Sequence, residues 1–203
     1  MLLFLELLVE NYMITLIPMI DKYKYNYIPL QDNIKPLIQN FMVGVKDFND
    51  MYILFCFIFF WFYLYYNNHL YLSIYRFTKS LFICRMIRLI GFSLTILPNP
   101  KHNCFSERFY PNTISINEQY HNIEWTEIFN ARPGIGGCND LIISGHTITY
   151  VLMCLEVYDY FKYGFIVYIP LIYKFLIIIH ESRHYSVDVF LGVVISKLIW
   201  DRK

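Results

Sequence analysis

MYILFCFIFFWFYLYY, residues 51–66, is an uninterrupted run of apolar and aromatic side chains without a single charge. As an α-helix rising about 1.5 Å per residue, the run spans roughly 24 Å and nearly crosses the hydrocarbon core of a bilayer. Such a run is typical of a helix that lies among lipid chains or other apolar helices. It therefore predicts a fold built from membrane-spanning helices.

The composition of the whole chain agrees with this prediction. Hydrophobic residues make up 57% of the 203 residues and charged residues 16%, which is too apolar for an ordinary soluble domain. The apolar residues form several blocks separated by short polar stretches, as in a polytopic helical protein. With a formal net charge of +1 and scattered Lys and Arg, the chain has no basic patch for nucleic acid, and lipids are the expected partners.

Further blocks have the length and composition of membrane helices, namely residues 81–97, 141–158, 161–179 and 185–200. Residues 1–20 add another helix if they cross the membrane, and the acidic Glu6 and Glu10 argue against a cleavable signal peptide there. The expected fold class is all-α: one polytopic transmembrane bundle of about six helices, or five if residues 1–20 lie at the interface. Residues 1–80 are expected to form its N-terminal helices and a polar loop, and residues 81–203 its catalytic helices.

A long polar stretch, residues 98–140, interrupts the helical pattern and is rich in Pro, Asn, Gly and charged residues. Loops of this length within compact domains are often functional. Cys104 and Cys138 lie in it and could form a disulfide in an oxidising compartment, but their spacing leaves both the pairing and the compartment open. Asp140, at its end, is placed to cap the N-terminus of the following helix.

Polar residues mark the starts of two predicted helices. Ser144-Gly145-His146 opens one of them, and the segment from His184 to Asp188 opens another, two crossings later. The two intervening crossings form a hairpin with a very short turn, so both helix starts are expected at the same end of the bundle. His146 and His184 can then lie close to each other.

The spacing of these residues suggests acid–base and nucleophilic chemistry. His184 and Asp188 are four apart, which on a helix lets the carboxylate hold one ring nitrogen of the imidazole. A neutral histidine fixed in this way can attack phosphorus, and a second, protonated histidine can donate to the departing oxygen. A helix-end histidine bonded to backbone beside a surface ion pair is the alternative, and a zinc site of two His and one Asp is another, unsupported by HExxH or paired cysteines.

The motifs around both histidines resemble a known family. CNDLIISGHT, residues 138–147, followed by RHYSVDV, residues 183–189, is similar to the sphingomyelin synthase-related branch of the lipid phosphate phosphatase (PAP2) superfamily. Upstream, RMIRLIGFSLTILPNPKHNC, residues 85–104, resembles the arginine-containing helix, the Leu-Pro-x-Pro exit and the following cysteine of those enzymes. The resemblance covers about residues 85–200.

This resemblance implies a catalytic triad and a reaction. His184 would be the nucleophile that takes up the phospho-headgroup, Asp188 its orienting carboxylate, and His146 the acid and base for the alcohols. The implied reaction moves a headgroup from a membrane phospholipid to ceramide or a diacylglycerol-like lipid, through a phosphohistidine-type intermediate and without a metal or organic cofactor. The implied setting is a multi-pass protein of the Golgi, endoplasmic reticulum or plasma membrane, with both termini cytosolic and the site on the lumenal or outer face.

Other residues are candidates for substrate binding. Arg85 and Arg88, three apart on one side of a helix, could neutralise a phosphate or extend to the membrane interface. Ser144 belongs to the turn before His146, and Asp140 precedes it. Glu181 comes shortly before His184, where it could line the pocket or belong to a polar helix junction.

Two departures from the family bear on the reaction. Cys138-Asn139-Asp140 stands where the family has Cys-Gly-Asp, and the Lys-x6-Arg-Pro motif of the phosphatases is absent, which favours the synthase branch. Two other hypotheses stay open. One is a lipid phosphate phosphatase that uses water as acceptor, and the other is a catalytically silent membrane protein that binds ceramide or phospholipid.

Overall fold

The computed structural model describes residues 5–6, 8–10, 12–14, 29–42, 50–95, 97–100, 141–161 and 164–202. The regular elements in these ranges are all helical, which confirms the all-α prediction for this part of the chain. The elements are α2 (Lys35–Phe41), α3 (Asp50–Tyr66), α4 (Leu70–Leu94), α7 (Gly145–Tyr160), the 3-10 helix η1 (Gly164–Val167), α8 (Tyr168–His180) and α9 (Ser186–Asp201). The described residues between 5 and 14 are also helical.

The boundaries of α3 and α9 follow the expected apolar blocks closely, whereas α4, α7 and α8 begin four or more residues from the expected positions and α2 lies outside every expected block. α3 coincides with the aromatic run, and it ends where Asn68 adopts a left-handed backbone with φ 58°, a conformation that Asn tolerates better than most residues. α4 begins at Leu70, well before the predicted residue 81, and its polar residues Ser73 and Arg76 contact Glu156 and Asp159 of α7. It crosses residue 80 without a break, and the proposed division of the chain at that residue stays a prediction.

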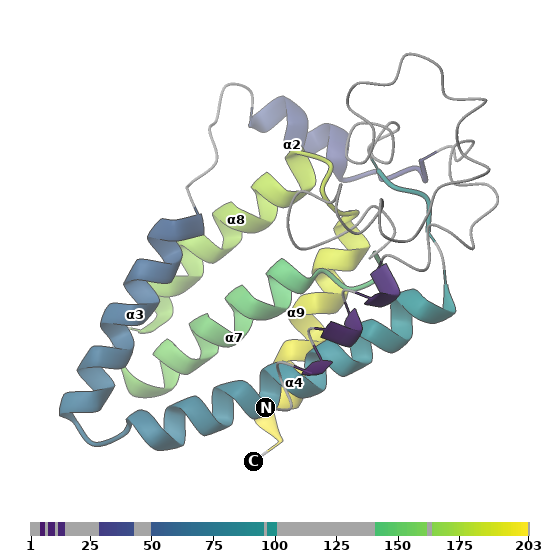
Figure 1. Cartoon of the computed structure of the whole chain (residues 1–203). Helices are drawn as coiled ribbons and strands as arrows, with labels where there is room; N and C mark the ends of the chain where they lie inside the picture. The colour runs from purple at the N-terminus through teal and green to yellow at the C-terminus, as the bar shows by residue number, and fades with distance from the viewer. Residues whose placement is uncertain are drawn as a thin grey trace, which may run out of the picture.

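α7 occupies the centre of the bundle (Figure 1). It packs most extensively on α9, and it also contacts α4, η1 and α8, while α2 packs on α8 and α3 on α4. The main apolar core lies among these helices, and its most deeply buried members come from α3, α4 and α7: Leu64, Cys84, Ile148 and Leu152. Burying α7 on several sides fixes the position of its first turn, which carries His146.

Two glycines allow close approach between elements. A Cβ on Gly192 of α9 would lie 3.0 Å from both Cβ and Cγ2 of Thr147, a tight contact, so glycine here favours the close approach of α9 to the first turn of α7. A Cβ on Gly164 would lie 2.5 Å from the backbone Cα of Tyr158, which makes the tight turn from α7 into η1 dependent on glycine.

A polar cluster joins α4, α7 and α9 at the end of α7 remote from His146. The buried Glu156 carboxylate accepts a hydrogen bond from Ser73. Arg76 forms an ion pair with Asp159, and its guanidinium lies 4.0 Å from the ring centroid of Trp200. The indole Nε1 of Trp200 donates to Asp159 at 3.2 Å. These contacts tie the far ends of the helices together and so support their alignment at the histidine end.

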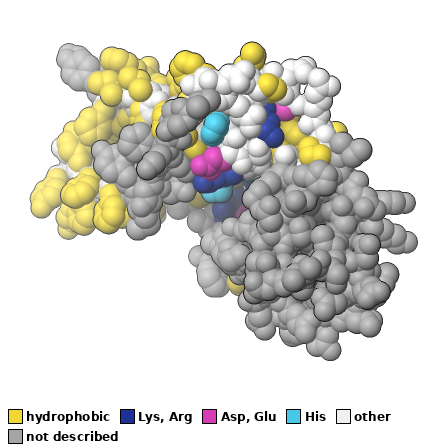
Figure 2. Space-filling model, turned by 90° about the horizontal axis from the view of Figure 1, so that it is seen from above, with side chains coloured by type: hydrophobic (Ala, Val, Ile, Leu, Met, Phe, Trp, Pro, Cys, Tyr) yellow, Lys and Arg dark blue, Asp and Glu magenta, His cyan; other side chains and the backbone are white. Residues whose placement is uncertain are grey.

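The outer side of α3 carries large exposed aromatic side chains. Phe55, Phe59 and Phe62 are 54%, 71% and 57% exposed, and Figure 2 shows hydrophobic side chains covering the side of the molecule where α3 lies. Contiguous exposed apolar surface marks contact with a lipid phase or another apolar partner. Among the described residues, no helix combines the length and the hydropathy needed to cross a bilayer. The expected bundle of about six membrane helices stays a prediction.

Candidate active site

Asp188 and His184 meet at the start of α9. The α9 helix begins at Ser186, so His184 precedes it, and the two side chains approach across the N-terminal turn and not along a helical face as expected. Asp188 Oδ2 accepts a hydrogen bond from the Tyr185 backbone N–H at 3.1 Å and lies 3.5 Å from His184 Nδ1. Asp188 is fully buried and His184 is 6% exposed. The carboxylate therefore fixes the helix start, and it faces one side of the imidazole at ion-pair distance without a hydrogen bond to Nδ1.

The same carboxylate also holds the segment that leads into α7. Asp188 Oδ1 accepts from the Ile142 N–H at 3.2 Å, and the Asp188 carbonyl accepts from the Ser144 N–H, also at 3.2 Å. Ile142 has φ 81°, a strained conformation for a β-branched residue that persists only where the surroundings impose it. Asp188 thus joins the segments that carry His184 and His146, and both lie at the same end of the bundle (Figure 1).

The turn before His146 is shaped by capping. Ser144 is the N-cap of α7, and its hydroxyl oxygen accepts from the Thr147 N–H at 3.3 Å. Ser144 itself is fully buried, whereas His146 is exposed in the first turn. The imidazole of His146 stands beside Tyr150, with ring centroids 6.4 Å apart. The Ser144 cap therefore fixes the first turn of α7, while the imidazole of His146 stays exposed on the surface.

Arg88 supports the same turn from α4. Its Nε donates to the Ile143 carbonyl at 3.0 Å, and a Cβ on Gly145 would lie 3.2 Å from that nitrogen. Arg88 is only 3% exposed and forms an ion pair with the Glu10 carboxylate. The Arg88 guanidinium therefore stabilises the turn before His146.

The second arginine has acidic neighbours from the start of the chain. Arg85 Nη1 lies 3.5 Å from a carboxylate oxygen of Glu6 and 3.6 Å from one of Glu10. Both glutamates are at most 4% exposed. The expected role of Arg85 and Arg88 at a substrate phosphate stays a prediction, and any such phosphate would have to share these guanidinium groups with two carboxylates.

A clamp that the sequence did not indicate holds the start of α9 from the other side. Asp32 Oδ2 accepts from the Ser186 N–H at 2.7 Å, and its Oδ1 accepts from the Ser186 hydroxyl at 2.9 Å. The Tyr185 hydroxyl accepts from the Leu30 N–H at 2.9 Å and donates to the Pro98 carbonyl at 2.8 Å. Partial burial raises the pKa of Asp32, but the hydrogen bonds from Ser186, Ile34 and Lys35 outweigh it and hold the pKa below its ordinary value.

The remaining candidate residues lie away from this network or beyond the described ranges. Glu181 is exposed in the turn between α8 and α9, where its carboxylate pairs with Arg183. Asp140, Cys104 and Cys138 lie outside the described residues. Seen from above, histidine, acidic and basic side chains gather in one small area of the surface (Figure 2). No group of three or more metal-ligating side chains occurs among the residues that the structure describes.

The part of the chain that forms this site is similar to known proteins. Residues 137–202, which include both histidines and Asp188, match the family described as PAP2 superfamily C-terminal. The chain is also 34% identical over 125 residues to phosphatidylinositol:ceramide inositolphosphotransferase 2 of Arabidopsis thaliana, a match that covers 56% of this chain and 37% of that protein. No solved structure gave a significant match. The C-terminal part of the chain is therefore similar to the PAP2 superfamily C-terminal family, and the chain spans little more than a third of the length of the plant relative that it matches.

Proposed function

We propose that the protein is a lipid phosphotransferase that moves a phosphate-linked headgroup from a glycerophospholipid to the hydroxyl of ceramide or a similar lipid alcohol. The observation that carries the proposal is the position of Asp188, whose carboxylate faces His184 Nδ1 and accepts from the backbone that leads to His146. The family match supports phosphoryl chemistry at these residues. The relative from Arabidopsis is named for transfer to ceramide, which makes ceramide the first acceptor to test.

The first step of the proposed reaction loads the enzyme. Asp188 lies at Nδ1 of His184, so Nε2 is the nitrogen that attacks phosphorus. The bond between phosphorus and the glycerol oxygen breaks, and His146 in its protonated form gives its proton to that oxygen, so diacylglycerol leaves. The headgroup phosphate is then bound to His184.

The second step reverses these roles. The acceptor hydroxyl gives its proton to His146, its oxygen attacks phosphorus, and the bond between phosphorus and His184 breaks. Both histidines return to their starting protonation states, and no metal or organic cofactor takes part in either step. The exposed position of His146 suits a group that must exchange protons with two successive alcohols.

Transfer in liposomes tests the proposal directly. The full chain is reconstituted with fluorescent ceramide and, in turn, phosphatidylcholine, phosphatidylethanolamine or phosphatidylinositol, and labelled products are separated by chromatography. We expect a new polar lipid with one donor, and His184→Ala should lower its rate of formation by at least about 10³-fold, because the nucleophile is lost. His69→Ala is the matched control, since this exposed histidine immediately precedes α4 at the opposite end of the bundle and makes no side-chain capping bond.

Other outcomes would point to the competing hypotheses. Release of free phosphate from phosphatidic acid without any acceptor lipid would identify a phosphatase. Binding of ceramide without product from any donor would favour a catalytically silent lipid-binding protein. Equal rates for the wild type and His184→Ala would contradict the proposed nucleophile.

A further inference from the structure

An apolar cavity of about 540 Å³ lies where α3 meets α7 and α8. Its size is within the range of small-molecule sites in proteins, which is about 300–1,000 Å³. α3 contributes Phe57 and Phe60, α7 contributes Met153 and Val157, and α8 contributes Leu171 to its lining. The cavity is thus lined by three different helices and open on one side.

The lining of the cavity is mostly apolar, and Tyr150 is its polar residue on α7 nearest the histidine end. Tyr150 is in the second turn of α7, whereas Val157 lines the cavity two turns further along the same helix. On α8, which ends at His180 beside the site, Tyr173 and the buried Lys174 line the cavity. The opposite end, around the η1 turn, is lined by apolar groups and by Tyr63 of α3. A ligand with a long apolar extension matches this mostly apolar lining.

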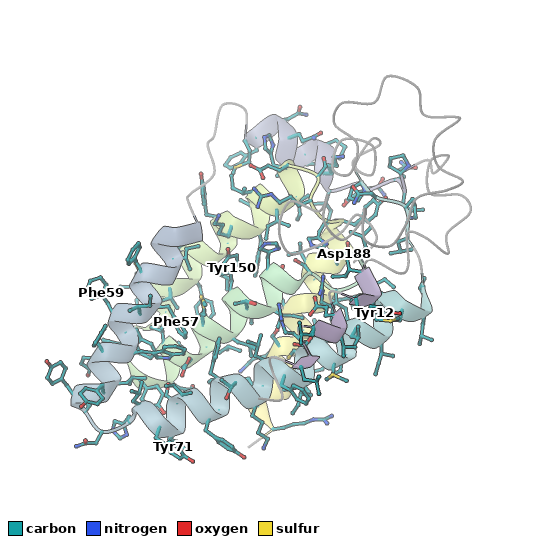
Figure 3. All side chains as sticks on the ribbon, viewed as in Figure 1. Tyr12, Phe57, Phe59, Tyr71, Tyr150 and Asp188 are labelled. Atoms are coloured by element: carbon teal, nitrogen blue, oxygen red, sulfur yellow. The ribbon has the colours of Figure 1, made fainter. Side chains whose placement is uncertain are left out.

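Tyr150 connects the cavity to the candidate active site. It lines the cavity, and it lies one helical turn after His146 on α7, with the two ring centroids 6.4 Å apart. Figure 3 shows Tyr150 on the side of α7 toward α3, where Phe57 also points inward. A molecule whose polar end reacts at His146 could therefore place an apolar extension past Tyr150 into the cavity.

We propose that this cavity binds a hydrocarbon chain of the lipid whose headgroup reacts at His146 and His184. The proposal rests on the proposed function, because it takes the reacting molecule to be a lipid. The chain would run along α7 from Tyr150 toward Val157, between α3 and α8. Both the phospholipid donor and the alcohol acceptor carry such a chain, and the experiment below distinguishes them.

The physical role of the cavity follows from its surroundings. A lipid chain that leaves a bilayer gains little hydrophobic free energy in an apolar cavity, because lipid tails are as apolar as the lining. The cavity then contributes mainly by shape: it orients the lipid so that its polar end meets His146. Filling it with a larger side chain should change which chains fit, and it should leave the chemistry at His184 intact.

Photo-crosslinking tests the proposal without requiring turnover. The full chain in phosphatidylcholine liposomes receives either a ceramide or a phosphatidylinositol with a diazirine in the middle of its acyl chain, and crosslinked peptides are identified by mass spectrometry after irradiation. We expect crosslinks to cavity-lining residues of α3, α7 and α8, reduced by an excess of the same unlabelled lipid. The probe that crosslinks, ceramide or phosphatidylinositol, identifies the lipid that uses the cavity.

Paired variants separate the cavity from the general lipid surroundings. Leu171→Trp fills the cavity and should lower the crosslinking yield at α7 at least about fivefold, whereas Ile172→Trp, at a neighbouring position that is 58% exposed, should leave it unchanged. Met153→Phe is the second cavity-filling variant if Leu171→Trp does not fold. Crosslinks confined to outward-facing residues, or equal yields for cavity and control variants, would overturn the proposal.

The two proposals can fail separately. Specific crosslinks in the cavity without any transfer product would support the chain site and contradict the phosphotransferase. A transfer product with no cavity crosslink from either probe would support the phosphotransferase and contradict the chain site.

Discussion

At the scale of single residues, Asp188 has three tasks that only a carboxylate in this position can combine. It accepts from the N–H groups of Tyr185 and Ile142 with its two oxygens, and it faces the imidazole of His184. A buried carboxylate is costly unless its oxygens accept hydrogen bonds, and each oxygen of Asp188 accepts one backbone N–H.

Asp188→Asn is expected to lower the rate of transfer by up to about 10⁴-fold, the loss seen when the carboxylate beside a catalytic histidine is replaced by an amide. The amide NH₂ cannot accept a hydrogen bond, so one backbone contact and the orientation of His184 are lost together. Steady-state transfer in liposomes measures the effect. Asp201→Asn, an exposed carboxylate on the same helix, is the control. A full rate for Asp188→Asn would show that His184 needs no orienting carboxylate.

At the scale of elements, the start of α9 is held from two sides. Asp188, a residue of α9 itself, connects the helix start to the Ile142 N–H before α7. Asp32, which precedes α2, accepts from both the backbone N–H and the hydroxyl of Ser186. The segment that contains Asp32 precedes α2, more than a hundred positions before α9 in the sequence. The two residues that follow His184 are thus held by two carboxylates from different elements: Asp188 binds the Tyr185 N–H, and Asp32 binds Ser186.

The Asp32 clamp predicts a pH-dependent contribution to stability. Because the folded pKa of Asp32 is below its ordinary value, the clamp stabilises the fold above about pH 3.9, the ordinary aspartate value, and its contribution is lost as the pH falls through the folded pKa. We expect Asp32→Ala to lower the free energy of unfolding by about 1 kcal/mol at pH 7, since the group is partly exposed. Denaturant unfolding at pH 7 and at pH 2.5 measures the difference in unfolding free energy between Asp32→Ala and the wild type, which should be smaller at the lower pH.

A neighbouring substitution controls for general effects of the segment. Asn33→Ala changes an exposed side chain and should leave both unfolding curves unchanged. A loss of stability from Asp32→Ala that is equal at both pH values would show that the carboxylate charge is not what stabilises the start of α9.

At the scale of the whole molecule, the start of the chain is connected to the site through charge. Glu10 pairs with the buried Arg88, and Arg88 donates to the Ile143 carbonyl beside the turn that carries His146. Residues far apart in the sequence therefore share one buried network with the candidate active site.

Glu10→Ala is expected to lower the free energy of unfolding by about 3–5 kcal/mol, the usual cost of removing one partner from a buried ion pair. Lys197→Ala, which breaks an exposed ion pair with Asp201, should cost less than about 1 kcal/mol. Thermal unfolding of both variants in the same detergent gives the comparison. If the two variants unfold at equal temperatures, the Glu10–Arg88 pair contributes no more than a surface pair.

The sequence by itself determined the helical class and the positions of most helices. Long apolar blocks have few alternatives to helices, and the short turn between α7 and α8 brings both histidine segments to one end of the bundle whatever the details of packing. The motifs around His146 and His184 are short and continuous in the chain, so the family resemblance could be recognised from them alone, and the family match covers both.

Only the tertiary structure decided how the site is held and what surrounds it. The contacts of Asp188 with Ile142, of Asp32 with Ser186 and of Glu10 with Arg88 join residues that are distant in sequence, and no local spacing or propensity encodes such pairs. The position of His184 before α9, and not within it, depends on where capping begins the helix. The cavity beside Tyr150 exists only because three separate helices leave space between their side chains. Local sequence patterns fix hydrogen bonding within a helix, whereas contacts between helices depend on the packing of the whole chain.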